Sequence, residues 1–389
     1  MVRGLRAFAY GFSSVLLGIR LADIFSPAKA GAIATVSLGG AAALSAFLGA
    51  RGDRIGRRRA HIALSVAMIA AMGAFAFTNS FAWLIVAALS GTVATTFLEA
   101  GPFVALEQAM LPHTVPSEGR TRAFGRYTAT AYVAGSLGAL AAGGPKAIQS
   151  LFNFSPPSER WFLLPAGLAL AQALFAAGLS GAVETPEVAR KPLQRSRSTV
   201  YKLSALFALD GLGGGFVVNL LVSYWFHSKY GTSAQLLGVI FFAVGIVQSI
   251  SVLLAARIAE RIGLINTMVF THLPSNVFLI LIPFAPNEGV AIGFLLGRVA
   301  LSQMDVPARQ SYVMAVVDAE ERTAAAGYTT TARSTAQAVS PSIYGSAAAT
   351  ASSGLPFFLG GGLKILYDIL LWKQFRALRT PEEEARLKP

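Results

Sequence analysis

Among the ionisable side chains inside the long apolar stretches of this 389-residue sequence, five are candidates for a function: Glu99, Asp210, Arg298, Asp305 and Arg333. Charged groups are costly in hydrocarbon, so those found at membrane depth usually face a polar cavity or pair with one another. A carboxylate that alternates between a paired and a desolvated state can take up and release a proton. These residues therefore predict a polar site that binds a small molecule and carries a proton. The alternative for each is a permanent structural ion pair or a position at the water interface.

A strongly basic stretch lies between two other apolar runs, where five arginines occur within residues 51–59. Each Arg costs at least about 2.5 kcal/mol in hydrocarbon, so the chain must turn at a membrane surface there. Gly52 and Gly56, on either side of Asp53, permit the positive φ of a sharp turn between helices. We predict a tight hairpin over residues 49–59. The acidic Asp53 indicates more than an orientation signal.

The composition identifies the class of protein. Hydrophobic residues make up 54% of the chain and charged residues only 13%, whereas soluble domains are about 25% charged. Apolar runs of near 20 residues recur from end to end, and about 20 are needed to cross a bilayer. We predict an all-α polytopic membrane protein. Its net charge of +13 lies in alternate loops, which indicates topology and attraction to anionic lipid rather than nucleic-acid binding.

Twelve apolar stretches predict twelve membrane-spanning helices, an even number that places both termini on one side. Basic residues gather at the termini and in alternate loops, so we expect cytoplasmic termini and a cell inner membrane. The sequence Ala28-Lys29-Ala30 resembles a signal-peptide cleavage site, but Arg20 and Asp23 precede it, so we predict a retained first helix. The expected spans are residues 5–24, 30–48, 60–79, 82–106, 122–145, 161–183, 200–226, 234–257, 264–285, 289–308, 324–348 and 356–375.

Two short matches indicate that the chain contains a duplicated unit. Residues 53–56 recur as residues 260–263, an offset of 260 − 53 = 207. Residues 119–125 resemble residues 321–327, an offset of 322 − 120 = 202. Parallel repeats of six spans imply a pseudo-two-fold axis along the membrane normal, with a site between the halves. We predict an N-terminal six-helix bundle over 1–183, a cytoplasmic linker over 184–199, a C-terminal six-helix bundle over 200–376 and a cytoplasmic tail over 377–389.

The basic hairpin resembles the loop signature of the major facilitator superfamily, Gly-x-Leu-Ala-Asp-Arg-x-Gly-Arg-Lys between the second and third helices. The copy in the second half keeps part of the pattern and lacks the basic tail. Together with the duplicated twelve-span layout, the resemblance extends over nearly the whole chain. The matching residues are Gly49, Asp53, Arg54, Gly56, Arg57 and Arg58 in the first half, and Glu260, Arg261 and Gly263 in the second.

This resemblance implies a transporter in which two halves rock around a central cavity. In the family, the loop acid that matches Asp53 docks at the start of the eleventh helix while the cytoplasmic side is closed. We therefore infer that Asp53 meets the backbone amides near residues 323–326, because a helix N-terminus stabilises an anion. Since the contact exists in one state only, it would shift the population between states.

The fifth span carries a glycine pattern that resembles, imperfectly, a motif of drug:proton antiporters. Close packing of helices through small residues is the alternative. The fourth-helix Arg of those antiporters has no counterpart here, which puts their usual coupling arrangement in doubt. We predict proton-coupled efflux of a small molecule; the alternatives are metabolite uptake by symport, or a non-transporting assembly factor or lipid scramblase with the same fold. The pattern consists of Gly135, Gly138, Gly143, Gly144 and Pro145.

We find no motif for enzyme chemistry in the sequence. It has no Cys, and so no disulfide or thiolate site. No phosphate-binding loop is present, and the glycines of residues 211–215 follow no strand of a dinucleotide fold. We expect no metal or cofactor, a proton gradient as driving force, a small-molecule substrate, a lipid bilayer around the protein, no nucleic acid and a monomer. The histidines, which lack ligand spacing, are His61, His113, His227 and His272.

Overall fold

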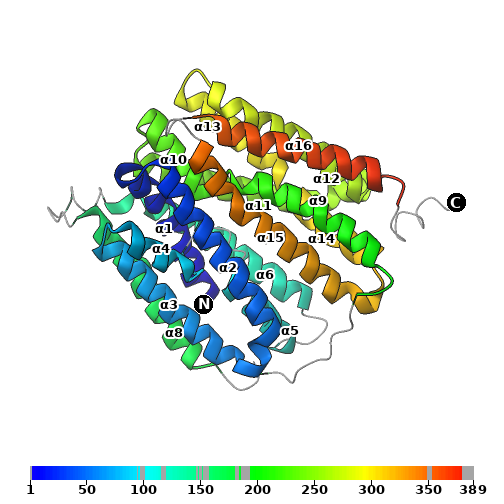
Figure 1. Ribbon diagram of the computed structural model, residues 1–389, viewed down its shortest axis with the longest axis horizontal. Helices are drawn as coiled ribbons and strands as arrows, with labels where there is room; N and C mark the ends of the chain where they lie inside the picture. Colours follow the sequence, from blue (N-terminus) through cyan, green and yellow to red (C-terminus); the bar gives the residue numbers. More distant parts are fainter. Residues whose placement is uncertain are drawn as a thin grey trace. The chain divides into compact units, whose positions relative to one another are not determined.

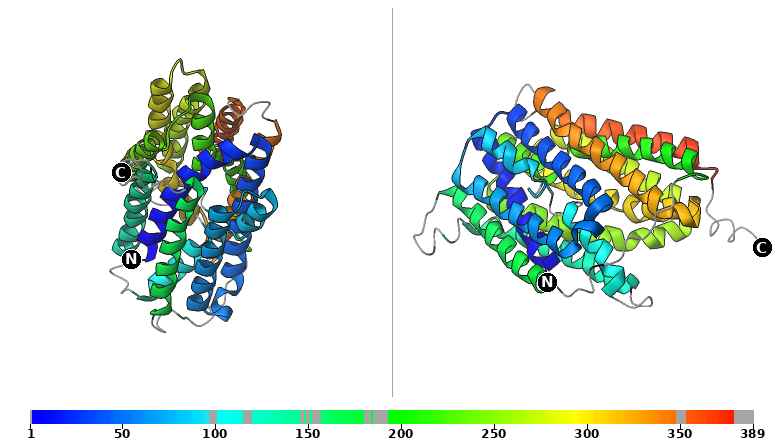
Figure 2. Two further views of the ribbon diagram at one scale, coloured as in Figure 1. Left: turned by 90° about the vertical axis from the view of Figure 1, so that its left-hand side faces the viewer. Right: turned by 60° about the horizontal axis from the view of Figure 1, so that its bottom comes forward.

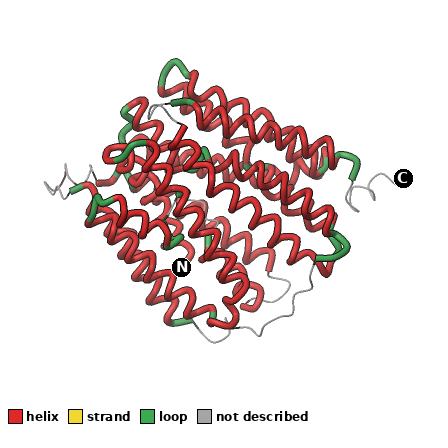
Figure 3. Tube along the Cα trace, in the orientation of Figure 1, coloured by secondary structure: helices red, strands yellow, loops and turns green. Residues whose placement is uncertain are grey.

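In the computed structural model, the described part of the chain consists of helices and loops, without a strand (Figure 3). The structure describes residues 2–93, 95–96, 101–114, 120–145, 148, 151, 157–179, 184, 193–347 and 353–378. The predicted all-α fold is confirmed. It follows from the apolar runs, because in hydrocarbon a helix satisfies every backbone N–H within its own segment.

The described helices run along the whole length of the chain. In the first half of the chain they are α1 (Val2–Ile24), α2 (Pro27–Ile55), α3 (Arg57–Phe77), α4 (Phe81–Leu89), α5 (Pro102–Thr114), α6 (Arg120–Ala141), η2 (Ser158–Phe162) and α8 (Leu163–Ala177). In the second half they are α9 (Arg197–Gly215), α10 (Asn219–Tyr230), α11 (Ala234–Ile262), α12 (Leu264–Leu281), η4 (Ile282–Phe284), α13 (Glu288–Ser302), α14 (Asp305–Val316), η5 (Ala319–Glu321), α15 (Arg322–Ala347) and α16 (Leu355–Phe375).

Nine segments of the described chain are long and apolar enough to cross a membrane. They comprise α1, α2, α3, η2 with α8, α9 with α10, α11, α12 with η4, α13 with α14, and α16. The three other predicted spans correspond to α4 with α5, to α6 and to α15, which fall outside that set. The protein is therefore an integral membrane protein with many spanning helices.

Three of the predicted spans are interrupted rather than continuous. The span predicted at 82–106 is split between α4 and α5, and Gly91 after α4 has a positive φ of 63°. The span predicted at 200–226 breaks after the glycines that end α9, since glycine is among the weakest helix formers. The span predicted at 289–308 breaks between α13 and α14, and α14 runs on to Val316. The sequence did not reveal these interruptions, although the second and third stretches remain single segments long enough to cross a membrane.

The chain forms two compact units. The junction between Val188 and Ala189 falls inside the linker predicted at 184–199, and both α11 and α15 contribute to each unit. The division into two six-helix bundles remains a prediction. Unit 1 consists of Met1–Val188, Val218–Ile246 and Pro341–Ser352, and unit 2 consists of Ala189–Val217, Val247–Ser340 and Ser353–Pro389.

In unit 1, α1 packs against α6, α8 and α10, while α2 packs against α4 and α5 (Figure 1). Gly11 of α1 lies directly against the backbone of Gly135 in α6, and Gly138 of α6 lies against the backbone of Phe8. A Cβ at Gly11 or at Gly138 would meet backbone atoms of the other helix. The close packing of α1 and α6 therefore explains this part of the fifth-span glycine pattern without an antiporter role.

In unit 2, α16 packs against α9 and α12, and α12 also packs against α13 and α14 (Figure 2). The apolar core of the unit includes Leu203, Phe207, Met268, Tyr312 and Tyr367, all at most 2% exposed. This core occupies the part of the unit that also carries the buried charges described below, and it holds the helices that position them.

The predicted hairpin at 49–59 is shorter than expected, because α2 continues to Ile55 and α3 begins at Arg57. Only Gly56 turns the chain, with φ 91°. Gly263 does the same between α11 and α12, with φ 86°. Both preceding helices have 29 residues, and the two turns are offset by 263 − 56 = 207 residues. The matching geometry supports the duplicated unit, since positive φ favours glycine at both turns.

Gly56→Ala is expected to lower the free energy of unfolding by about 1–3 kcal/mol, because an L-residue is strained at this φ. Gly73→Ala is the matched control, because Gly73 lies inside α3, the helix that follows Gly56. A Cβ at Gly73 would meet nothing within 4 Å. That change should stabilise the protein by about 0.5–1 kcal/mol. Unfolding in SDS would measure both variants, and equal stability of the two would contradict the role of Gly56.

Glu184, at the start of the predicted linker, holds the beginning of α3 within unit 1. Its carboxylate accepts hydrogen bonds from the backbone N–H of Arg57 at 2.7 Å and of Arg58 at 3.1 Å. A carboxylate at a helix N-terminus satisfies unpaired N–H groups and interacts favourably with the helix dipole. The two arginines of the predicted loop signature are thus engaged through their backbone.

Glu321 plays the corresponding part at the other end of the linker, within unit 2. Its carboxylate accepts hydrogen bonds from the N–H groups of Gln194, Arg195 and Ser196 at 2.8, 2.8 and 2.9 Å. These bonds, that of Ser196 above all, lower the pKa of Glu321 to about 2. The side chain therefore stays ionised over the pH range in which transport is measured, and it adds nothing to the pH dependence there.

Candidate functional site

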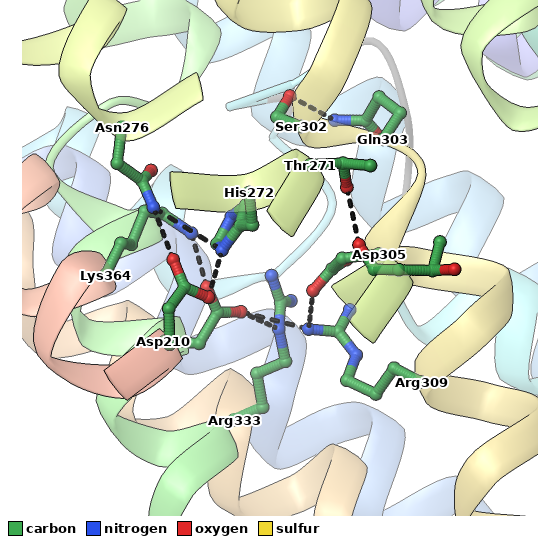
Figure 4. A network of polar contacts seen from close by, with 12 residues as sticks. Asp210, Thr271, His272, Asn276, Ser302, Gln303, Asp305, Arg309, Arg333 and Lys364 are labelled. Atoms are coloured by element: carbon green, nitrogen blue, oxygen red, sulfur yellow. Dashed lines mark hydrogen bonds and ion pairs between the residues drawn. The ribbon is translucent and has the colours of Figure 1, made fainter. Parts of the chain in front are cut away.

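Asp210 of α9 lies at the centre of a buried ionic cluster in unit 2, with its side chain 1% exposed. Three cations from three other helices contact it (Figure 4). Arg309 Nη1 of α14 and Arg333 Nε of α15 each lie 3.0 Å from Asp210 Oδ2. Lys364 Nζ of α16 donates to Oδ1. Arg309 also donates to Asp305 Oδ2 at 3.2 Å, one helical turn away in α14.

The glycines that follow Asp210 allow these helices to approach α9. Gly211 lies against the backbone of Arg333 in α15, and Gly215 lies against the backbone of Gln337 in the same helix. A Cβ at Gly213 would lie 2.9 Å from the carbonyl oxygen of Gly360 in α16. Small residues let helix backbones pack closely in membranes. The glycine run therefore brings the cations of α15 and α16 within reach of Asp210.

Arg298 of α13 adds a fourth cation, close enough to Asp210 to interact electrostatically. It makes no hydrogen bond to a described residue, and its Nε is buried. Removing one partner from a buried ion pair costs about 3–5 kcal/mol, because the remaining charge is left uncompensated. The single carboxylate of Asp210 is thus the main counter-charge for several buried cations.

A second set of polar contacts lies beside this cluster and joins α12 to α16. His272 Nδ1 lies 2.9 Å from Asp368 Oδ1, and Asn276 Nδ2 donates to Asp368 Oδ2 at 3.0 Å. Asp368 is four residues after Lys364, so both side chains lie on one face of α16. Figure 4 shows His272 and Asn276 next to the contacts of Asp210.

Unit 1 contains a buried polar cluster of a different kind. Arg6 of α1 binds both oxygens of Glu107 in α5, at 2.7 and 2.6 Å. The same carboxylate accepts a hydrogen bond from Tyr127 of α6 at 2.6 Å and lies 3.1 Å from His61 Nε2 of α3. A bidentate Arg–carboxylate pair with its remaining lone pairs occupied is a stable arrangement. This cluster links α1, α3, α5 and α6, and within these contacts the charge of Arg6 is balanced by that of Glu107.

Of the five residues predicted at membrane depth, the structure brings Asp210, Asp305 and Arg333 into one network and places Arg298 beside it. The fifth, Glu99, lies outside the described residues. The pairs form within unit 2, among helices of the second half of the chain.

The residues of the predicted loop signature lie at the ends of α2 and α11 and the starts of α3 and α12. The side chains of Asp53 and Arg54 lie outside the described part of the chain, and so do the surroundings of Gly49 within α2. The inferred contact of Asp53 therefore stays a prediction. Arg57 is buried, and Arg58 donates to the carbonyl oxygen of Leu179 at 3.3 Å. In the second copy Glu260 and Arg261 are exposed and Gly263 forms the turn.

Sequence reasoning missed Arg309, Lys364, His272 and Asp368. Lys364 and Asp368 lie within the last predicted span, so the cost of charge in hydrocarbon would have identified them as it identified Asp210. Arg309 follows Asp305 by four residues, the spacing of a helical ion pair, but it lies one residue beyond the predicted end of its span. His272 had no sequence signal, because its partners come from another helix.

Comparison with known proteins supports the architecture. The sequence model described as Major Facilitator Superfamily matches residues 2–341 and, in a second match, residues 203–389. An uncharacterised membrane protein of Saccharomyces cerevisiae is 26% identical over 406 residues, which cover 94% of this chain and 91% of that protein. The fold is similar to that of the nucleoside transporter NupG, with a TM-score of 0.74 and 13% sequence identity; the match covers 96% of this chain and 97% of that chain. It is also similar to a D-xylose-proton symporter, with a TM-score of 0.68, 16% identity and coverage of 96% of each chain.

Proposed function

The chain belongs to the major facilitator superfamily of membrane transporters. On this basis we propose that it moves a small molecule across the membrane by alternating access. We further propose that a proton is the coupling ion and that Asp210 carries it. The observation that carries this proposal is the set of contacts of Asp210. A carboxylate held by three cations has an ionised state with all three partners and a protonated state without their full attraction. Such a group links proton binding to the arrangement of three helices.

Charged or titratable groups face Asp210 from every helix packed around it. Protonation of Asp210 would leave the cations without their main counter-charge, so it would favour either a rearrangement or the entry of another anion. The side chain of Arg333 is 30% exposed, which gives water or substrate an approach to the cluster. The facing groups are Lys364 from α16, Arg309 and Asp305 from α14, Arg333 from α15, Arg298 from α13 and His272 from α12.

The interrupted helices support a binding site at this depth. Transporter sites are typically formed by discontinuous helices near the bilayer midplane. Asp210 lies within the last two turns of α9, just before the break between α9 and α10. Asp305 is the first residue of α14, just after the break that follows α13. Both breaks therefore lie next to residues of the Asp210 cluster.

We call the end of unit 1 that carries the α1–α2 connection, at Phe25 and Ser26, the outer end. Contacts within unit 1 support a state that is closed at this end. There Gly18 of α1 lies against Ser223 of α10, and Gly31 of α2 lies against Pro341 of α15. Helices from both halves of the sequence thus pack tightly at this end. Alternating access requires that these contacts separate when the cavity opens there.

Asp53→Asn is expected to reduce transport by up to about 30-fold, the factor that corresponds to about 2 kcal/mol, while folding and insertion are kept. The reason is the docking of Asp53 inferred from the family resemblance, which only a charged carboxylate would support fully. Initial flux in proteoliposomes measures the effect, and Asp53→Glu is the control that keeps the charge. Normal transport by correctly inserted Asp53→Asn would exclude this role.

Proton-coupled efflux and proton-coupled uptake are both compatible with this site. The surplus of buried cations disfavours a cationic drug as substrate, and this observation favours the second candidate, uptake by symport. We propose that the protein acts as a monomer in a cell inner membrane with cytoplasmic termini, as the distribution of basic loops indicates. An assembly factor or scramblase would not require the buried charges for its activity.

The test is a ligand-stabilisation screen on purified protein, followed by flux of the stabilising solute in proteoliposomes under an imposed pH gradient. The proposal expects flux that the gradient accelerates and that a protonophore abolishes. A flux that is the same with and without the pH gradient would exclude proton coupling. Lipid scrambling by the same proteoliposomes, without solute flux, would support the scramblase alternative.

A further inference from the structure

The ionic cluster of unit 2 holds more positive than negative charge. Arg298, Arg309, Arg333 and Lys364 lie near three carboxylates of the described residues, those of Asp210, Asp305 and Asp368. Counting all three carboxylates as ionised leaves 4 − 3 = 1 cation without a counter-charge. Buried charge without a counter-charge is strongly unfavourable.

The surplus charge lies on Arg298 and Arg333. Arg333 uses only its Nε for Asp210, and its terminal nitrogens make no hydrogen bond within the described chain. Arg298 makes none there either. Both guanidinium groups lie within electrostatic reach of Lys364. By contrast, Arg309 has two carboxylate partners and Lys364 donates directly to Asp210.

Gly214 marks the place where a ligand would reach these cations. A Cβ at Gly214 would lie 3.8 Å from Lys364 Nζ and 4.0 Å from Arg333 Nη2, with no backbone of another helix in between. Its neighbours Gly213 and Gly215 are packed against other helices, whereas Gly214 is partly exposed. An oxygen anion beside Gly214 would therefore meet the charged ends of both side chains.

From this arrangement we infer that the substrate is a small organic anion, and that its carboxylate or phosphate group binds Arg298 and Arg333 beside Gly214. The inference rests on the proposed function, because it assigns a substrate class to the same site. Guanidinium groups with free terminal nitrogens bind carboxylate or phosphate through paired, charge-assisted hydrogen bonds. A neutral or cationic solute would leave the surplus charge in place.

This assignment also determines how substrate and proton are coupled. Asp210 competes with an external anion for Arg333, which it contacts directly, and for Arg298, with which it interacts electrostatically. Protonation of Asp210 removes that competition, so the anion and the proton bind cooperatively, and each raises the affinity for the other by the same factor. Cooperative binding supports transport of both in one direction, which is symport.

Thermal stabilisation of the purified protein tests the inference with matched probes. The panel contains benzoate, benzyl alcohol and benzylamine, then glycerol 3-phosphate and glycerol, and finally sulfate. We expect stabilisation by at least one anion and none by the neutral or amine counterparts. Arg298→Gln and Arg333→Gln should each weaken that binding about tenfold or more, as loss of a charge-assisted contact implies. Arg257→Gln is the matched control, because Arg257 is exposed on α11 of the same unit.

Equal stabilisation by a neutral or amine probe, no stabilisation by any anion, or unchanged anion binding in both Arg variants would overturn the inference. The circular dichroism spectrum of each variant would verify that it folds, and Gly214→Asp gives a second measurement. Its carboxylate would lie beside Lys364 and Arg333 and should reduce anion binding about tenfold or more. Gradient-driven flux of a neutral or cationic solute would uphold the proposed function and refute the anion, so the two failures are distinguishable.

Discussion

Asp210→Asn is expected to abolish proton-driven accumulation of the substrate and to leave counterflow exchange intact. The amide keeps the size of the carboxylate but has no charge, so it resembles the protonated state permanently. Exchange requires only that the loaded site alternates, whereas accumulation requires a group that gains and loses a proton. Accumulation in proteoliposomes with an imposed pH gradient should therefore fall to background, and the pH dependence of exchange should disappear.

Two further variants make this result interpretable. Asp210→Glu keeps a carboxylate and should retain pH dependence, although the tight packing around Asp210 lowers its rate. Asp318→Asn removes a carboxylate that is 51% exposed in the same unit, and it should behave as the unchanged protein. Persistent counterflow by Asp210→Asn shows that the variant is folded. If accumulation and its pH dependence survived in that variant, Asp210 would have no part in coupling.

A cross-link between cysteines introduced at Asp23 and His227 is expected to stop transport completely. The two side chains meet at the outer end of unit 1, where His227 Nε2 of α10 lies 3.0 Å from Asp23 Oδ1 of α1. The link would prevent α1 and α10 from separating, so the cavity could not open at that end. The sequence contains no Cys, so a bifunctional thiol reagent reacts only with the introduced pair. A reductant that cleaves the link should restore the flux.

The control pair joins two helices from the same half of the sequence, α12 and α16, which alternating access does not require to separate. Phe270 of α12 and Trp372 of α16 pack with ring centroids 6.5 Å apart on the outside of unit 2. Cysteines at these positions should cross-link equally well and leave transport unchanged. Full activity of the linked Asp23–His227 pair would mean that the outer contacts stay closed during transport, which alternating access does not allow.

Local sequence predicted the features that depend on local chemistry. Gly56 and Gly263 were recognisable because a sharp turn requires a backbone conformation that glycine adopts easily. Asp210 and Arg333 were recognisable because charge inside an apolar stretch is costly wherever the neighbours lie. The length and apolarity of the spans were sufficient to predict an all-α membrane fold.

What sequence could not supply was the identity of partners on other helices. Nothing near Asp210 indicates that Lys364, over 150 residues later, donates to it. The break after α9 was also missed, because a glycine run inside an apolar stretch fits either a flexible helix or a close helix contact. Only the positions of α15 and α16 show that Gly211 and Gly213 serve close packing. The pairing of His272 with Asp368 likewise depends on how α12 and α16 pack.

The most direct measurement is the number of protons that the purified protein takes up when an anion binds. Isothermal titration in two buffers of different ionisation enthalpy gives this number for the unchanged protein and for Asp210→Asn. If the anion and the carboxylate of Asp210 share the same cations, binding is accompanied by proton uptake in the unchanged protein and by none in the variant. Binding without proton uptake, or the same uptake in both proteins, would contradict coupling through Asp210.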